Sequence, residues 1–204
     1  MSKVSISKKN IKMGNIMSVS LPAGTTCRPD APCRKKCYAL KMENFRKNVK
    51  DACARNLEVL TNEPETYWRE VEAAIMVSRF FRFHVSGDIP NEDYLCNMIA
   101  VAKRNPHCEI LCFTKKYELV NAELDKGTVL PDNLHMIFSV WPGLDIVNPY
   151  QLPEAHVIFK SGFTTACDGA KWCGGNCTEC GTERWGNGGC WKLHNGEQVL
   201  FLEH

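Results

Sequence analysis

The sequence of 204 residues lacks the long apolar segments of membrane proteins and the signature motifs of several enzyme classes. No stretch approaches the roughly 18 apolar residues that a membrane-spanning helix requires, and the N-terminal residues contain no apolar run long enough for a secretion signal. The G-x-x-x-x-G-K-[ST], G-x-S-x-G and H-E-x-x-H motifs are also absent. We therefore expect a cytoplasmic protein without a membrane partner, and without nucleotide-hydrolysis or serine-hydrolase chemistry.

Acidic residues are scarce at the start of the chain. Residues 1–37 contain eight Lys or Arg and one acid, Asp30, a net charge of +7, whereas the whole chain carries +2. The other residues must therefore carry −5, which is +2 minus +7. Such a basic segment indicates either an anionic partner, with nucleic acid or a host protein as the alternatives, or compensation of thiolate charge at a metal site.

Cysteine, in contrast, is abundant, with twelve residues in the chain. In a reducing cytoplasm, many cysteines indicate metal ligands or catalytic thiols before disulfides, although the even number leaves disulfides open. Eight of the twelve lie in two loop-like segments rich in Gly or Pro, one near each end of the chain. Cysteines that only fill a core do not normally gather in polar loops, so we expect both segments to bind metal.

The N-terminal group has the spacing Cys27-x5-Cys33-x3-Cys37. This spacing lacks the paired C-x2-C knuckles of a zinc ribbon. Three thiolates would leave one iron of a four-iron cluster open to a small molecule. We therefore expect these three cysteines to hold a catalytic 4Fe–4S cluster.

The C-terminal group contains five cysteines, one more than a single four-ligand site needs. We expect Cys173 to be the spare. The set suits a second iron–sulfur cluster, and the Cys177-x2-Cys180 pair equally suits a structural zinc. The expected ligands of this second metal are Cys167, Cys177, Cys180 and Cys190.

The remaining cysteines and nearby tryptophans have plainer interpretations. Three tryptophans interleaved with the second group either shield a metal from water or simply pack. We expect core packing for the four other cysteines. The tryptophans are Trp172, Trp185 and Trp191, and the cysteines are Cys53, Cys96, Cys108 and Cys112.

Hydrophobic periodicity predicts strands alternating with helices between the two cysteine groups. Such alternation indicates right-handed βαβ units and a parallel sheet, with functional loops at the carboxyl ends of the strands. Asn91 is the expected N-cap of the third helix and Gly127 the expected end of the fourth. Strands are expected at 81–85, 109–114, 134–141, 156–160 and 198–202, with short ones near 4–6 and 17–21, and helices at 45–60, 68–75, 91–102 and 117–124.

Few βα units are visible, and the connection 141–155 is too short and broken for a crossover helix. The expected fold is therefore α/β, a partial βα barrel or an open, mostly parallel sheet. We expect a single domain over residues 1–204, with a basic segment at 1–37, a βα core at 38–160 and a cysteine-rich segment at 161–204 that folds back on the core.

Polar residues at the expected strand ends form a second set of site candidates. The ends of parallel strands face the same side, so Asp88, Lys115 and Lys160 are expected to line one mouth and orient an anionic or zwitterionic ligand. His84, between Phe83 and Val85, is expected to be a satisfied buried residue rather than a base.

Four short motifs occur in order along the chain: Cys37-Tyr38-Ala39, the strand 83–88, Phe113-Thr114-Lys115, and the tail 177–181. Together they resemble phage proteins of the gene product 88-like family over about residues 20–192. The resemblance implies a phage or prophage origin, and hence the cytoplasm of a bacterial host.

A more distant resemblance is to radical S-adenosylmethionine enzymes, in which three loop cysteines hold a cluster and a Gly-Gly-Glu strand end holds the cofactor. Ser86, Gly87 and Asp88 occupy that position here, and the resemblance implies that they bind S-adenosylmethionine. The cysteine spacing differs from the usual Cys-x3-Cys-x2-Cys, and Asp replaces Glu. The alternative is that Gly87-Asp88 is only a strand-to-helix turn.

Two functions follow. One is an iron–sulfur enzyme of radical S-adenosylmethionine-like descent that acts on an unknown substrate. The other is a non-catalytic module, stabilised by zinc or clusters, whose basic N-terminal region binds nucleic acid or a host protein.

Overall fold

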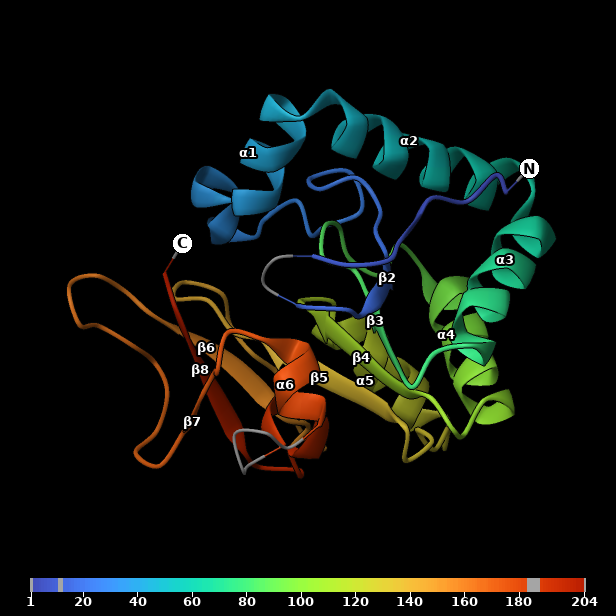
Figure 1. Ribbon diagram of the computed structural model, residues 1–204. Coiled ribbons are helices and arrows are strands. Elements are labelled where there is room, and N and C mark those ends of the chain that lie inside the picture. The colour runs from blue at the N-terminus through green and yellow to red at the C-terminus, as the bar shows by residue number, and fades with distance from the viewer. Residues whose placement is uncertain (1, 11–12, 183–187, 204) are drawn as a thin grey trace.

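An eight-stranded sheet forms the centre of the computed structural model, which describes residues 2–10, 13–182 and 188–203 (Figure 1). The strands lie in the order β1-β2-β3-β4-β5-β6-β8-β7, and every neighbouring pair is parallel except β1 and β2. The strands are β1 (Ile6–Ser7), β2 (Met17–Val19), β3 (Phe80–Phe83), β4 (Glu109–Thr114), β5 (Leu134–Ser139), β6 (Glu154–Ile158), β7 (Lys171–Trp172) and β8 (Gln198–Leu202).

Helices connect the first parallel strands. They are α1 (Tyr38–Phe45), α2 (Lys47–Asn62), α3 (Pro64–Met76), α4 (Glu92–Arg104), α5 (Tyr117–Asp125) and the short α6 (Cys177–Gly181), with 3-10 turns at Pro32–Lys36 and Gly189–Lys192. Within the described residues the outer strands β1 and β7 do not pair with each other, so the sheet is open. The α/β prediction is confirmed. No helix among the described residues is long and apolar enough to span a membrane.

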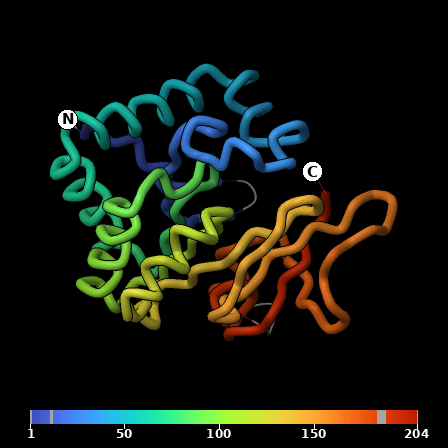
Figure 2. Tube along the Cα trace, turned by 180° about the vertical axis from the view of Figure 1, so that it is seen from behind, coloured from blue at the N-terminus to red at the C-terminus, as the bar shows by residue number. Residues whose placement is uncertain are grey.

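The ends of α4 and α5 follow directly from their sequences. The Asn91 side chain accepts a hydrogen bond of 2.9 Å from the backbone N–H of Tyr94, which confirms it as the N-cap of α4. After α5, Gly127 adopts a φ of 85° and its N–H donates to the Leu124 carbonyl, which ends the helix as predicted. Figure 2 shows α4 and α5, green to yellow-green, in front of the strands when the molecule is seen from behind.

Residues of the central strands alternate between two covered faces of the sheet. In β3, Phe81 and Phe83 are buried in the cluster formed with the helices, whereas Arg82 lies on the opposite face. In β4, Ile110 faces the helices and Leu111 faces the other side. Because both faces are covered, these strands are nearly continuous apolar runs.

The C-terminal segment covers the face opposite the helices, as predicted. Cys180, Trp191 and Leu193 form a second apolar cluster with Leu111 and Ile137 of the sheet. In Figure 1, α6 lies in front of the strands, on the side away from α5. Four of the five cysteines of this segment, all except Cys167, therefore pack on this face of the sheet.

The N-terminal residues 13–16 join the same face. The Thr178 hydroxyl donates to the Met13 carbonyl at 2.9 Å and accepts from the Asn15 N–H at 2.9 Å. A Cβ at Gly14, whose φ is 71°, would lie 2.4 Å from the Thr178 hydroxyl oxygen, so this approach requires glycine. The beginning of the chain thus fixes α6 and its cysteines against the sheet.

Several predicted boundaries differ from the structure. The strand predicted at 81–85 ends at Phe83, because His84 adopts a φ of 59°, which no strand continues. The strand β7 and the helix α6 were not predicted, and both are short. The connection from β5 to β6, residues 140–153, contains no helix, as expected.

Packing roles were predicted for four isolated cysteines, and three are confirmed. Cys53, Cys108 and Cys112 are buried. The prediction for Cys96 is wrong, since this thiol is exposed on α4. Its thiol lies beside Glu92 and Glu123 between α4 and α5, whereas the neighbouring Leu95 enters the core.

Candidate functional site

The first cysteine loop lies over the carboxyl end of β3. The backbone N–H of Leu21 donates to the Ser86 carbonyl at 3.1 Å, and the N–H of Asp88 donates to the Thr26 hydroxyl at 3.0 Å. Between them Gly87 has a φ of 82°, and a Cβ there would lie 2.6 Å from the Leu21 carbonyl oxygen. The loop can approach the strand end this closely only because residue 87 is glycine.

Three half-buried cysteines of this loop share one electrostatic environment. Burial raises the pKa of the Cys27 thiol, and negative charge on Asp88, Cys37 and Cys33 raises it further. Burial also raises the pKa of Cys33, where the Lys115 ammonium opposes the rise and Cys37 adds to it. The thiols of Cys27 and Cys33 therefore lie within electrostatic range of Cys37 and Asp88, and Cys33 also within that of Lys115.

Asp88 is buried and joins the ends of two strands. Its Oδ1 accepts from the Thr114 hydroxyl at 2.6 Å and from the Ile89 N–H at 2.8 Å, and its Oδ2 accepts from the Lys115 N–H at 2.9 Å. Burial raises the pKa of the Asp88 carboxyl, and these hydrogen bonds oppose the rise. The carboxylate of Asp88 holds the end of β3 to β4, and the backbone N–H of the same residue holds it to the cysteine loop.

Ser86 points toward α1 rather than toward the three cysteines. Its hydroxyl donates to the carboxylate of Glu43, a buried residue of α1 that also accepts from the Ala23 N–H at 2.9 Å. The Ser86 hydroxyl thus anchors the cysteine loop to α1, and its expected contact with a cofactor stays a prediction. Glu43 was missed by the sequence analysis, because an acid in an amphipathic helix normally faces water.

Cations stand beside the cysteine loop. The Lys115 ammonium donates to the Ser139 hydroxyl at 2.7 Å, which places it at the carboxyl ends of β4 and β5. The Arg28 guanidinium donates to the Lys115 carbonyl at 3.3 Å and forms ion pairs of 2.9 Å with Asp30 and Glu118. This edge of the sheet is therefore suited to an anionic group.

Lys160 lies at the carboxyl end of β6 and is exposed. Its backbone N–H donates to Glu203 at 3.3 Å, and Glu203 forms an ion pair of 2.9 Å with Lys36. Lys160 therefore lies on the expected edge of the sheet, beside the β8 end, and its backbone N–H contacts Glu203 rather than Asp88 or Lys115.

His84 is part of a buried polar chain inside the helix-facing core. Its Nε2 lies 3.1 Å from the Tyr94 hydroxyl, which lies 2.9 Å from the Tyr67 hydroxyl, and its Nδ1 lies 3.9 Å from the Cys112 sulfur. Burial lowers the pKa of His84 to about 3. A neutral, doubly partnered imidazole agrees with the prediction that this histidine is not a base.

Four cysteines of the C-terminal segment line one cavity on the other face of the sheet. Arg82 of β3, Phe113 of β4 and the ring of Trp191 line it as well. Gly189, with a φ of 52°, would bring a Cβ to 2.9 Å from the Cys180 sulfur, so the chain passes directly over a thiol. The cysteines are Cys173, Cys177, Cys180 and Cys190.

Cys173 thus takes the place in which Cys167 was expected. The backbone N–H of Cys173 donates to the Leu200 carbonyl at 2.9 Å, because the residue directly follows β7, which pairs with β8. Cys167 precedes β7, is exposed, and lines a separate cavity of about 220 Å³ that also contains the ion pair of Lys171 and Glu197. The two-residue strand β7 determines which of the two cysteines lines the cavity, and no sequence pattern predicts this strand.

The thiols of this second group are costly to ionise without a counter-charge. Burial raises the pKa of Cys177, Cys180 and, most strongly, Cys190, and the neighbouring cysteines add to each rise. Arg82 opposes the rise at Cys177 and Cys190. A bound metal would supply the missing positive charge.

Of the three tryptophans near this group, Trp191 shields the cavity. It is buried, and its indole N–H donates to the Cys177 carbonyl at 2.9 Å. Trp172 is 56% exposed and does not enclose the site, whereas Trp185 lies outside the described residues.

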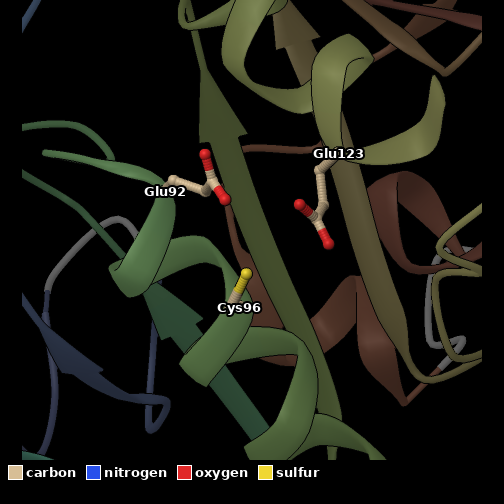
Figure 3. A group of neighbouring side chains, drawn as sticks. All are labelled: Glu92, Cys96 and Glu123. Atoms are coloured by element: carbon tan, nitrogen blue, oxygen red, sulfur yellow. The ribbon is translucent and has the colours of Figure 1, made fainter. Parts of the chain in front are cut away.

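A third group of potential ligands, Glu92, Cys96 and Glu123, lies between α4 and α5 (Figure 3). Their ligand atoms lie within 4.8 Å of one another. The Lys126 ammonium already contacts Glu92 at 2.6 Å and Glu123 at 3.0 Å, and the Thr128 hydroxyl donates to Glu123 at 2.6 Å. The acids of this group are therefore matched by protein donors without an ion.

The basic N-terminal region is partly neutralised by acids from elsewhere. Lys3 pairs with Glu63 at 2.6 Å, in addition to the pairs of Arg28 and Lys36. Around α1, however, basic and apolar side chains are exposed together. These are Arg34, Lys35, Lys41, Arg46, Lys47 and Lys50, with Tyr38, Met42 and Phe45.

Fold and sites together define an α/β protein with an open sheet, three half-buried cysteines in a loop at the end of β3, and four cysteines that line a cavity on one face of the sheet. The chain belongs to the gene product 88 family, whose model matches residues 2–181. It is 29% identical over 148 residues to the gene 88 protein of Mycobacterium phage L5, a match that covers 65% of this chain and 60% of that protein. No solved structure matches the chain.

Proposed function

We propose that this protein is an iron–sulfur protein in which Cys27, Cys33 and Cys37 hold a 4Fe–4S cluster with one iron open to a small molecule. The observation that supports this proposal is that three half-buried thiols lie on one loop at the carboxyl ends of parallel strands. Ligands of open α/β sheets bind at that edge. Thiolates are the donors that iron–sulfur clusters require, so the residues fit the group.

The surrounding charges favour a ligand with a carboxylate. Lys115 stands beside Cys33, and Lys160 lies at the end of β6 on the same edge. S-adenosylmethionine is the cofactor to test first, since its amino-acid end carries a carboxylate for a lysine and an amine for the partly used Oδ2 of Asp88. A bound cluster would supply the open iron and an electron.

The C-terminal cysteines are the second centre of this proposal, with an iron–sulfur cluster or zinc as the bound group. It lies between the sheet and Trp191, where Cys180 is buried and the other three cysteines are half-buried. A site with four cysteine ligands leaves no open position, which suits a structural or electron-relay role. A reducing bacterial cytoplasm is the compartment in which these thiols would stay available for metal.

The test is anaerobic purification followed by iron, sulfide and zinc analysis and an absorption spectrum. Wild type is expected to hold about four or eight irons with a broad visible band. A variant with Cys27, Cys33 and Cys37 all changed to Ser should lose the iron that is bound at the N-terminal site. The exposed control Cys96→Ser should keep all of its iron. Zinc without a visible band would overturn the proposal.

The cofactor is tested separately on the reduced protein. S-adenosylmethionine binding, followed by calorimetry, and its cleavage under dithionite are the expected results. If the cofactor neither binds nor is cleaved, the cofactor assignment falls and the cluster assignment stands.

A non-catalytic, metal-stabilised module that binds nucleic acid or a host protein is the second candidate function. The exposed cations around α1, together with the exposed Phe45, favour it. Binding to random DNA or RNA should weaken steeply with salt, and Lys41→Glu with Lys50→Glu should abolish it, whereas Lys103→Glu on α4 should not. Loss of binding without loss of cofactor cleavage would separate the two functions.

A further inference from the structure

We propose that the C-terminal centre is an iron–sulfur cluster on Cys173, Cys177, Cys180 and Cys190, and that Arg82 is a positioning residue that donates a hydrogen bond to this cluster. The inference deepens the second centre and rests on the proposed function, which left zinc open there. It also changes the ligand set, since Cys167 is replaced by Cys173.

Arg82 reaches the cavity because of its place in β3. Phe81 and Phe83 on either side face the helices, so the side chain of Arg82 must lie on the opposite face. The guanidinium carbon stands 4.8 Å from the centre of the Phe113 ring, and the positive charge of the guanidinium opposes the rise in the pKa of the Cys177 thiol. A cation is therefore built into the wall of a cysteine-lined cavity.

One donor of this guanidinium is unused. The Nε atom of Arg82 is buried and has no hydrogen-bond partner among the described residues. A buried N–H without an acceptor costs about 1–3 kcal/mol, so native proteins rarely leave one. An acceptor inside the cavity would remove this cost. The sulfide ions of a cluster are such acceptors, in addition to the four thiolates.

The apolar surroundings of the cavity strengthen the effect of the Arg82 charge on a bound cluster. Phe113, Val199, Phe201 and Trp191 line the cavity and keep water from the sulfurs. In such an environment a positive charge and an N–H···S hydrogen bond stabilise the reduced, more negative cluster and raise its reduction potential. Arg82 thus sets the potential of the centre and helps to retain the metal.

Two exchanges test the ligand set in the background that lacks the three N-terminal cysteines. Cys173→Ser should lose iron and the visible band, whereas Cys167→Ser should keep both. If zinc is found instead of iron, or if Cys167→Ser is the variant that loses iron, the ligand and metal assignment is overturned.

Arg82→Gln and Arg82→Lys test the positioning role in the same background, with Arg79→Gln as the matched control. Arg79 lies one residue before β3, is exposed, and stacks on Phe80 at 5.2 Å. Arg82→Gln should shift the midpoint potential to more negative values and weaken iron retention about 10–100-fold. Arg82→Lys, which keeps the charge but not the planar donors, should fall between, and Arg79→Gln should match the background.

An unchanged potential in both Arg82 variants would overturn the role of Arg82. Should Arg82→Gln fail to fold, the potential of Arg82→Lys alone decides. The background also separates the two proposals. If the N-terminal exchanges remove only part of the iron, both the N-terminal cluster and the C-terminal cluster are supported. If these exchanges leave the iron content unchanged, the N-terminal cluster alone is refuted. Zinc at the C-terminal site refutes the C-terminal cluster alone.

Discussion

The carboxylate of Asp88 accepts a 2.9 Å hydrogen bond from the backbone N–H of Lys115, and this bond couples the ends of β3 and β4. The Asp88 N–H in turn holds the Thr26 hydroxyl, next to Cys27. The buried side chain of Asp88 therefore fixes the backbone of Lys115, and the backbone of the same residue fixes the loop that carries Cys27. Removal of the carboxylate should affect metal binding through geometry, without removing a ligand.

Asp88→Asn is predicted to destabilise the protein by about 1–3 kcal/mol and to lower the iron content. The amide has one acceptor oxygen, so the Lys115 N–H or the Thr114 hydroxyl would meet an NH2 group. Urea unfolding and iron analysis measure the two effects. Asp132→Asn, at an exposed acid, is the control, and equal stability of the two variants would contradict the structural role of Asp88.

Gly87→Ala is predicted to displace the cysteine loop. The φ of 82° alone costs an L-residue about 1–2 kcal/mol, and the new Cβ would lie 2.6 Å from the Leu21 carbonyl oxygen. Gly127→Ala is a matched control, because its φ is 85° and nothing lies within 4 Å of the added carbon. Unfolding free energies and iron retention should fall more in Gly87→Ala, and similar values in the two variants would refute the close approach.

The sequence predicted the fold well where apolar periodicity was long. The strand Glu109–Thr114 and the last strand, Gln198–Leu202, were predicted with their observed bounds, because both carry continuous apolar runs. The end of β3 was placed late, since the apolar Val85 continues the pattern while His84 turns the backbone to a φ of 59°. An apolar pattern does not reveal a residue with a positive φ when that residue is not glycine.

The candidate site was predictable in its residue types and less so in its pairings. Asp88 and Lys115 were found because both follow parallel strands. The choice between Cys167 and Cys173 depended on a two-residue strand, which carries too little sequence to detect. Arg82 was missed because a cation inside an apolar strand is normally interpreted as facing water, and its partners come from a segment that follows it by more than 90 residues.

The buried His84 predicts an acid-dependent loss of stability. Its pKa is about 3 in the folded protein and about 6.5 in an unfolded chain. Between these values only the unfolded chain binds the proton, so this contribution is present above pH 6.5 and decreases by up to about 1.4 kcal/mol per unit as the pH falls toward 3.

His84→Asn should remove that slope, since Asn tolerates the positive φ and does not titrate. The unfolding free energy of the variant and the wild type should be compared at pH 7, 6 and 5, and the gap between them should narrow as the pH falls. His107→Asn, at an exposed histidine that contacts the Met76 carbonyl, is the control. A gap that does not depend on pH would show that His84 is protonated in the folded state.

Ser86→Ala distinguishes a loop anchor from a cofactor ligand. The Ser86 hydroxyl donates to Glu43, a carboxylate that also holds the Ala23 N–H, so its loss leaves a buried acceptor with one donor fewer. We predict a loss of about 1 kcal/mol in unfolding free energy, with no change in the affinity for S-adenosylmethionine.

Lys115→Met should show the reverse of Ser86→Ala, with weaker binding of S-adenosylmethionine and a smaller change in stability, because the Lys115 ammonium contacts the hydroxyl of Ser139 at the strand ends. Calorimetric titration of both variants, with Ser161→Ala as an exposed control, measures the difference. Weaker binding in Ser86→Ala at unchanged stability would return this serine to the cofactor site.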